Sequence, residues 1–253
     1  MLADEMAGSG RWLFRYRSYL PLLLLPLAAV EMAAVGPLGF DFATQMAWDG
    51  ACVAVVLAGI VIRMATIGYA PPGTSGRTTG RPKARELNTT GAYSLARNPL
   101  YLGNILIYTG VLLTVGSWRL VLLAVPLFLL YYERIIAAEE EILLATFGDA
   151  FRDWAVKTPC LLPRFGAWKA PDRAFRWGKS LREFYAVFGA ASAIFLVKTS
   201  GEWLRLVRGG CLTSVEALKA TRIDPVWGGV FAATGLMFVV LRTIKKRTRL
   251  LRD

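Results

Sequence analysis

Residues 91–104, with the sequence GAYSLARNPLYLGN, join a basic loop to an apolar segment. Glycine and proline punctuate the loop before them, and the segment after them is apolar enough to enter a membrane. Arg97, Asn98 and Tyr101 are therefore expected at a boundary between water and hydrocarbon. Polar side chains are costly there unless they serve a site, so this corner is the first candidate for function.

The composition of the whole chain favours a membrane protein. Of its 253 residues 55% are hydrophobic, and the mean hydropathy is +0.44, which exceeds what an ordinary globular surface tolerates. The formal charge of +12 comes from Lys and Arg residues that fall between apolar segments. This distribution fits anionic lipid headgroups better than nucleic acid, so we expect a membrane partner and no nucleic acid.

Apolar segments predict an all-α, polytopic membrane protein with six transmembrane helices. The segments are Tyr19–Val35, Gly50–Ala70, Pro99–Val115, Trp118–Ala138, Phe184–Thr199 and Val226–Thr243. Only Gly116 and Ser117 join the third to the fourth, so these two should form an antiparallel hairpin. The fourth helix should continue to Phe147 and end at Gly148. The fifth segment is short, which leaves an interfacial or re-entrant segment as the alternative.

Loop charges predict the orientation. The N-terminus, residues 71–98, residues 139–182 and the C-terminus are basic and are expected in the cytoplasm, whereas residues 36–49 contain no Lys or Arg and are expected outside. The protein is expected in a bacterial inner membrane with both termini cytoplasmic. Residues 1–49 would hold the N-terminal segment, first span and external loop; 50–165 the polar motifs and spans two to four; and 166–253 an interfacial segment, two spans and a basic tail.

The content of histidine and cysteine limits the chemistry. The chain has no histidine, and Cys52, Cys160 and Cys211 have no paired or metal-ligand spacing. Neither a disulfide framework nor a metal site is indicated. Without imidazole, proton transfer would rest on carboxylates, lysine, tyrosine or the substrate itself.

The predicted hairpin brings two polar stretches together. Because the third and fourth spans are antiparallel neighbours, the start of one lies beside the end of the other. Arg97, Asn98 and Tyr101 should therefore lie near Glu139 and Glu140. The result would be a polar niche that opens laterally onto lipid.

Three linked motifs carry a family resemblance. They are Gly91-x-Tyr93-x-x-x-Arg97-Asn98-Pro99-x-Tyr101-x-Gly103, Glu139-Glu140-x-x-Leu143-x-x-x-Phe147-Gly148 and Lys157-x-Pro159-x-x-x-Pro163. In this order they resemble the integral-membrane methyltransferases, which include isoprenylcysteine carboxyl methyltransferases and phospholipid methyltransferases. The resemblance covers roughly residues 50–165.

The resemblance implies a helical membrane enzyme that binds S-adenosyl-L-methionine at its cytoplasmic face and methylates a lipophilic acceptor. It assigns the cofactor to Arg97, Asn98, Pro99, Tyr101, Gly103, Glu139, Glu140 and Pro163. Lys157 matches a basic position associated with the acceptor in the carboxyl methyltransferases. Asn98 stands where these families usually have histidine, so an orienting role is expected there but no acid–base role.

The missing histidine bears on the acceptor. A lipid phosphate or a prenyl-type carboxylate is already anionic and needs no base, whereas a protonated amine must first lose a proton. We expect Arg63, Lys157 and Arg164 to orient an anionic acceptor, with no metal. Arg63 lies two-thirds of the way along the second span, where its charge is costly unless it is functional or snorkels to the surface.

Other functions fit parts of the sequence. A phospholipid amine N-methyltransferase would share the same cofactor motifs. A sterol or polyprenoid reductase would need a nicotinamide-phosphate site, which only the basic loop from Arg77 to Arg85 could offer. A membrane scaffold that has lost catalysis is the non-enzymatic alternative, and Asn98 is the feature that suggests it.

Overall fold

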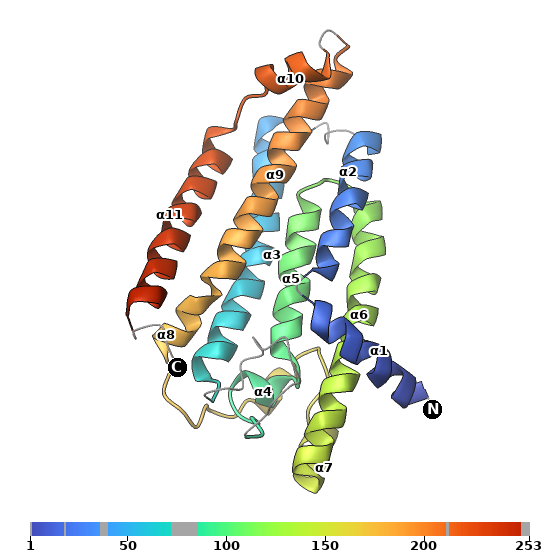
Figure 1. Cartoon of the computed structure of the whole chain (residues 1–253), viewed down its shortest axis with the longest axis vertical. Helices are drawn as coiled ribbons and strands as arrows, with labels where there is room; N and C mark the ends of the chain where they lie inside the picture. The colour runs from blue at the N-terminus through green and yellow to red at the C-terminus, as the bar shows by residue number, and fades with distance from the viewer. Residues whose placement is uncertain (1, 18, 36–39, 72–85, 211–212, 249–253) are drawn as a thin grey trace.

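The chain folds into a helical bundle. The computed structural model describes residues 2–17, 19–35, 40–71, 86–210 and 213–248, and no strand occurs among them. The first half contains α1 (Leu2–Tyr16), η1 (Leu20–Leu23), α2 (Leu24–Val35), α3 (Phe42–Tyr69), α4 (Ala92–Leu95), α5 (Pro99–Leu113) and α6 (Trp118–Phe147). The second half contains α7 (Asp149–Lys157), η2 (Phe165–Ala167), α8 (Trp177–Ser180), η3 (Leu181–Glu183), α9 (Phe184–Arg208), α10 (Ser214–Ala220) and α11 (Pro225–Arg247). The predicted all-α class is confirmed (Figure 1).

Four helical segments are long and apolar enough to cross a membrane: α3, α6, Trp177–Arg208 and α11. This makes the chain an integral membrane protein. The other two predicted spans correspond to α2 and α5, which have 12 and 15 residues. The predicted first span begins as the short η1, and Pro26 then falls in the first turn of α2, where its missing N–H is not needed.

The predicted fifth span is longer than its apolar core. Helix α9 continues nine residues beyond Thr199, to Arg208. No proline interrupts it, and Arg205 pairs with Glu202 one turn earlier, at 2.7 Å. The short segment that suggested a re-entrant loop is therefore the apolar part of a 25-residue helix.

The predicted hairpin forms from α5 and α6. Ser117 caps α6 by accepting a hydrogen bond from the backbone N–H of Leu120, and α6 ends at Phe147 as predicted. Gly148 follows with a φ of +54°, a left-handed conformation that favours glycine. The end of α6 and the start of α5 thereby come to one end of the bundle.

Glycines bring α3 and α5 into close contact. A Cβ atom on Gly59 would lie 2.5 Å from the carbonyl oxygen of Gly103, and one on Gly110 would lie 2.9 Å from that of Cys52. Small residues at such a crossing allow two helix backbones to approach inside a membrane. The close crossing fixes the start of α5 beside the last turns of α3.

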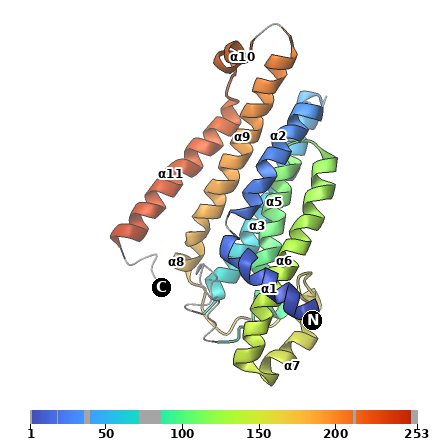
Figure 2. The ribbon, with the colours of Figure 1, turned by 45° about the vertical axis from the view of Figure 1, so that its right-hand side comes forward.

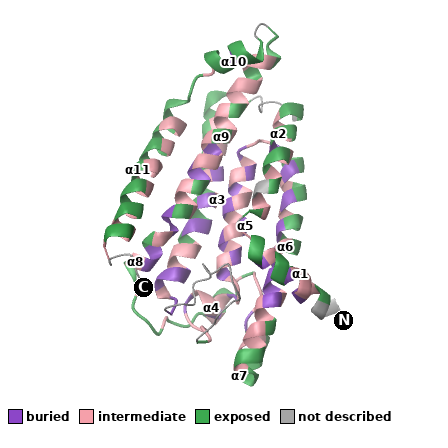
Figure 3. Cartoon of the chain, in the orientation of Figure 1, coloured by how far each residue is buried: buried purple, intermediate pink, exposed green. Residues whose placement is uncertain are grey.

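One end of the bundle, called the site end here, carries most of the irregular structure. Helices α4, α7 and α8 and the C-terminal end of α11 lie there, whereas α10 lies at the opposite end (Figures 1 and 2). Buried residues concentrate on the facing sides of the inner helices, and α11 contains none (Figure 3). The predicted orientation of these ends across the membrane stays a prediction.

Candidate functional site

Arg97 fastens three elements together at the site end. Its Nε donates to the Glu140 carboxylate on α6 at 2.7 Å. Its Nη1 donates to the backbone carbonyls of Ala155 and Thr158, at 2.9 and 2.8 Å. The predicted proximity of Arg97 to the two glutamates is therefore a direct contact at Glu140, and most of the guanidinium is occupied by protein groups.

The segment that follows α7 is held against residues 95–98. The backbone N–H groups of Arg97 and Asn98 donate to the carbonyls of Pro159 and Cys160, and the Arg164 N–H donates to the Leu95 carbonyl. The Asn98 side-chain amide also donates to the Cys160 carbonyl, at 3.1 Å. Burial, together with the nearby Glu140 charge, raises the pKa of the Cys160 thiol.

Glu139 faces a different set of partners from Glu140. It accepts a hydrogen bond of 2.8 Å from the Tyr101 hydroxyl, and the Tyr101 ring stacks on Tyr132 with centroids 4.7 Å apart. Arg17, which follows α1, lies 3.9 Å from the same carboxylate. Consecutive residues of α6 thus serve two sides of the site end.

Arg63 makes its contacts with a different set of residues from those that Arg97 contacts. Its Nε donates to the buried Glu183 carboxylate at 2.6 Å, and its Nη1 donates to the Asn104 side-chain oxygen at 2.5 Å. Gly103 leaves room for this arginine, because a Cβ atom there would lie 2.6 Å from Arg63 Cγ. Arg63 therefore joins α3 to α5 and to the start of the C-terminal helices.

Tyr93 on α4 lies close enough to Glu139 and to Arg63 for both charges to affect the pKa of its hydroxyl. Burial and the Glu139 carboxylate raise its pKa, while Arg63 opposes part of that shift. Its hydroxyl is therefore neutral at physiological pH and can serve as a hydrogen-bond donor.

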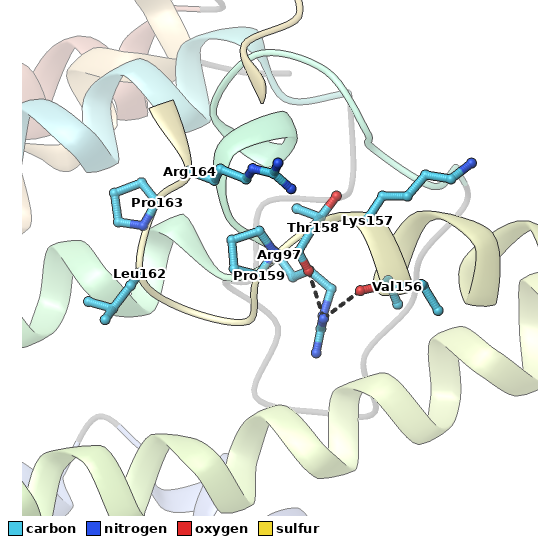
Figure 4. A pocket seen from close by; sticks show the side chains of 9 residues that line it. Arg97, Val156, Lys157, Thr158, Pro159, Leu162, Pro163 and Arg164 are labelled. Carbon is cyan, nitrogen blue, oxygen red and sulfur yellow. Dashed lines mark hydrogen bonds between the residues drawn. The ribbon is translucent and has the colours of Figure 1, made fainter. Parts of the chain in front are cut away.

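A pocket of about 520 Å³ opens beside Arg97. Its lining is Arg97, Ala155, Val156, Lys157, Thr158, Pro159, Leu162, Pro163 and Arg164, as Figure 4 shows. Within the described part of the chain, the side chains of Lys157 and Arg164 have no hydrogen-bond or ion-pair partner. The pocket therefore offers two cations that the fold does not use.

The comparison with known families adds to this geometry. Residues 50–150 match a family described as phospholipid methyltransferase. Residues 50–150 are therefore similar to the phospholipid methyltransferases. They include the Arg97 corner and both glutamates, so the family resemblance predicted from the motifs is confirmed there.

Two curated proteins match about half of the chain. The nickel-cobalt-cadmium resistance protein NccN of Alcaligenes xylosoxydans xylosoxydans is 32% identical over 128 residues, which cover 49% of this chain and 57% of that protein. The cobalt-zinc-cadmium resistance protein CzcN of Cupriavidus metallidurans is 31% identical over 127 residues, which cover 48% and 56%. The matches thus span little more than half of each relative. No solved structure matches the chain.

The structure divides the predicted site residues into three groups. Arg97, Lys157, Pro163 and Arg164 line the pocket, and all but Arg97 follow the phospholipid methyltransferase segment. Asn98, Pro99, Tyr101, Glu139 and Glu140 lie behind Arg97, at the junction of α5 and α6. Arg63 and Gly103 lie at the crossing of α3 and α5.

Sequence reasoning assigned no site role to four residues of this region. Tyr93 and Asn104 belong to the motif stretch, so their position could have suggested them. Arg17 and Glu183 lie outside the phospholipid methyltransferase segment, and no sequence signal pointed to either.

The described residues contain no group of three or more His, Cys, Asp or Glu side chains placed to hold a metal ion. Cys52 and Cys160 are free thiols. Cys211 and the loop from Arg77 to Arg85, which the reductase alternative needs, lie outside the described residues.

Proposed function

We propose that this protein is an S-adenosyl-L-methionine-dependent membrane methyltransferase whose acceptor is a lipophilic molecule with an anionic group. The observation that carries this proposal is the phospholipid methyltransferase match of residues 50–150. The geometry supports it, because Arg97 of that segment lies at a pocket that also contains the unpaired Lys157 and Arg164.

The residues at the site end fit the cofactor. A pocket of about 520 Å³ lies within the range of roughly 300–1,000 Å³ that small-molecule sites occupy. Outside the pocket lining, at the junction of α5 and α6, Glu139, Tyr101 and Asn98 offer a carboxylate, a hydroxyl and an amide, which suit an ammonium group and ribose hydroxyls. Pro163 would close the pocket. Bound S-adenosylmethionine supplies an electrophilic methyl group on a sulfonium.

Methyl transfer asks little acid–base chemistry of the protein. A bond forms between the acceptor oxygen and the methyl carbon as the carbon–sulfur bond breaks, so the negative charge of the acceptor and the positive charge of the sulfonium cancel. No proton has to leave an anionic acceptor. The protein contributes alignment and the exclusion of water, which suits a chain without histidine.

The rim of the pocket suits an amphiphile with an anionic head. Lys157 and Arg164 supply the positive charge for a phosphate or carboxylate. Next to them, Val156, Leu162 and Phe165 are among the most exposed apolar side chains, although they lie outside the four long apolar helices. Exposed apolar groups beside free cations match an apolar chain attached to an anion.

Methyl transfer in detergent tests the proposal. Purified protein is incubated with methyl-tritiated S-adenosylmethionine and lipid extract, and the labelled lipid is identified by mass spectrometry. We expect a methyl ester of a lipid phosphate or of a prenyl-type carboxylate. Label on amines alone would assign the protein to phospholipid amine N-methylation, and oxidation of a nicotinamide cofactor without methyl transfer would assign it to the reductases.

The names of the two relatives favour a physiological role in metal tolerance. Methylation of an anionic lipid removes a negative charge from the membrane surface, which lowers the local concentration of divalent cations. We therefore propose that the modified lipid contributes to resistance. Growth of cells with and without the gene in cobalt, nickel or cadmium tests this, and equal inhibition of both would contradict it.

A further inference from the structure

Helix α1 lies outside the segment that matches the methyltransferase family, yet it crosses α6 beside the candidate site (Figures 1 and 2). Ala7 and Phe14 are buried on the face that also contains Gly10. A Cβ atom on Gly10 would lie 1.9 Å from the Arg134 carbonyl oxygen, so α1 and α6 are in backbone contact there. This contact requires glycine.

Polar contacts set the register of α1 on α6. Arg11 pairs with Glu141 at 2.7 Å, and Arg134 donates to the Ser9 hydroxyl at 3.0 Å. Both contacts are exposed, so each contributes little energy. By setting where α1 lies on α6, they nevertheless set the position of Arg17, because this residue directly follows the last turn of α1.

Arg17 is delivered to Glu139 by this docking. Its guanidinium lies over the Phe14 ring, 4.0 Å from the centroid, and 3.9 Å from Glu139 Oε1. The same Oε1 accepts the Tyr101 hydrogen bond, so Arg17, directly after α1, and Tyr101 of α5 hold one carboxylate from two sides. The side chains of Arg17 and Glu139 are only 15% and 22% exposed, which limits screening by water.

The Glu139 carboxylate depends on the Arg17 guanidinium for a partner of opposite charge. The adjacent Glu140 already pairs with Arg97, which leaves Glu139 next to a like charge. Among the residues that the structure describes, Arg17 is the one cation within ion-pair distance of Glu139. A partly buried carboxylate without a paired cation would be desolvated at a cost and would turn toward water.

We propose that Arg17 is a positioning residue of the methyltransferase site, which holds Glu139 in the orientation that receives S-adenosylmethionine. The inference rests on the proposed function, since it assumes that Glu139 contacts the cofactor. Coupling between two sites is reciprocal, so α1 docking would strengthen cofactor binding, and cofactor binding would stabilise α1 on α6 by the same free energy.

Binding of S-adenosylhomocysteine to the full chain in detergent tests the proposal by calorimetry. We expect Arg17→Gln and Gly10→Leu to raise Kd about tenfold, within the roughly 5- to 150-fold range of coupled sites. Arg17→Lys should recover part of the loss. The matched controls are Arg15→Gln and Gly8→Leu, because Arg15 is exposed and a Cβ atom on Gly8 meets only the Arg11 side-chain tip, at 3.8 Å.

Hydrogen exchange of residues 5–16 gives a second readout that does not depend on catalysis. The ligand should slow this exchange in the wild-type protein and in both controls, but not in Arg17→Gln. If the wild-type protein fails to bind S-adenosylhomocysteine, the proposed function is wrong. If it binds, and Arg17→Gln binds equally well with the same protection of α1, the inference about Arg17 is wrong.

Discussion

Arg97 and Lys157 line the same pocket, but the fold treats their charges differently. Arg97 pairs with Glu140 and donates to two backbone carbonyls, so it holds α6, α7 and the segment after α7 together. Lys157 and its neighbour Arg164 have no partner in the described part of the chain. The charge of Arg97 at the inner wall of the pocket is therefore neutralised by a protein carboxylate, whereas the charges of Lys157 and Arg164 at the rim are not.

Arg63 belongs with Arg97 in this comparison. The sequence suggested that it orients the acceptor, and the structure pairs it with Glu183, whose side chain is 1% exposed. We expect a guanidinium with a buried carboxylate partner to hold helices together, because the loss of either partner leaves the other as an unpaired charge with little access to water. Substitutions should therefore separate paired cations, which stabilise the fold, from the rim cations Lys157 and Arg164, to which we assign ligand binding in our proposal.

The largest effect is expected from Glu183→Ala. It leaves the Arg63 charge buried, so the free energy of unfolding should fall by about 3–5 kcal/mol. Denaturation in detergent, followed by tryptophan fluorescence, measures it. Glu202→Ala in α9, the helix that follows Glu183 directly, is the control, because the ion pair of Glu202 with the exposed Arg205 should contribute less than about 1 kcal/mol. Equal losses from the two variants would contradict the structural role of the Arg63 pair.

Arg97→Ala should be the second most destabilising change. The Arg97 and Glu140 side chains are 17% and 25% exposed, so solvent screens the pair and the loss should be about 2–3 kcal/mol, below the range for fully buried pairs. The segment after α7 should loosen, and methyl transfer should be lost with it. Arg152→Ala, which breaks an exposed pair with Asp149, is the control. An Arg97 variant as stable as this control would place Arg97 with the rim cations.

The double variant Lys157→Gln, Arg164→Gln should behave in the opposite way. Its free energy of unfolding should change by less than about 0.5 kcal/mol, since neither side chain has a partner to lose. Methyl transfer should fall at least about tenfold, because a charge-assisted hydrogen bond contributes roughly 1.5–3 kcal/mol. Unchanged methyl transfer by the double variant would show that Lys157 and Arg164 do not belong to the functional site.

Asn98→Ala should lower the free energy of unfolding by about 1 kcal/mol, less than the changes at the paired arginines, because the backbone N–H of Asn98 still donates to the Cys160 carbonyl. Loss of the amide also removes a hydrogen-bond donor 3.7 Å from the Cys160 sulfur, and this donor favours the thiolate, so the pKa of the Cys160 thiol should rise further above its ordinary value. Less thiolate would then exist at pH 7 than in the wild-type protein, and the difference should vanish above the raised pKa of the thiol.

Alkylation by a maleimide, with Cys52 and Cys211 replaced by serine, measures this change in Cys160 reactivity. Asn88→Ala is the control, since Asn88 accepts only a 3.5 Å contact from Thr90. Equal rates of alkylation across the pH range for Asn98→Ala and this control would show that the Asn98 amide does not stabilise the Cys160 thiolate.

The parts of the fold that local sequence determines could be predicted. The α5–α6 hairpin followed from a two-residue link, and the end of α6 followed from Gly148, whose positive φ suits glycine. The approach of Arg97 to Glu139 and Glu140 followed from the hairpin alone. The assignment of ligand roles to these residues stays a prediction.

The parts that depend on tertiary packing could not be predicted. Arg63 and Glu183 are 120 residues apart, and no pattern in either segment indicates the pair. Helix α1 was hidden because its sequence is largely polar and its buried face combines the small Ala7 and Gly10 with a single large side chain, Phe14. The partner of Arg17 could not be found without that helix.

The central claim is that residues 50–150 form a methyltransferase whose acceptor is held by the rim of the pocket. Transfer of tritiated methyl from S-adenosylmethionine to membrane lipid, compared between the wild-type protein and the double variant Lys157→Gln, Arg164→Gln, tests it most directly. The account predicts label on an anionic lipid group with the wild-type protein and at least about tenfold less with the equally stable double variant. Absence of labelled lipid with folded wild-type protein, or equal labelling by both, would contradict it.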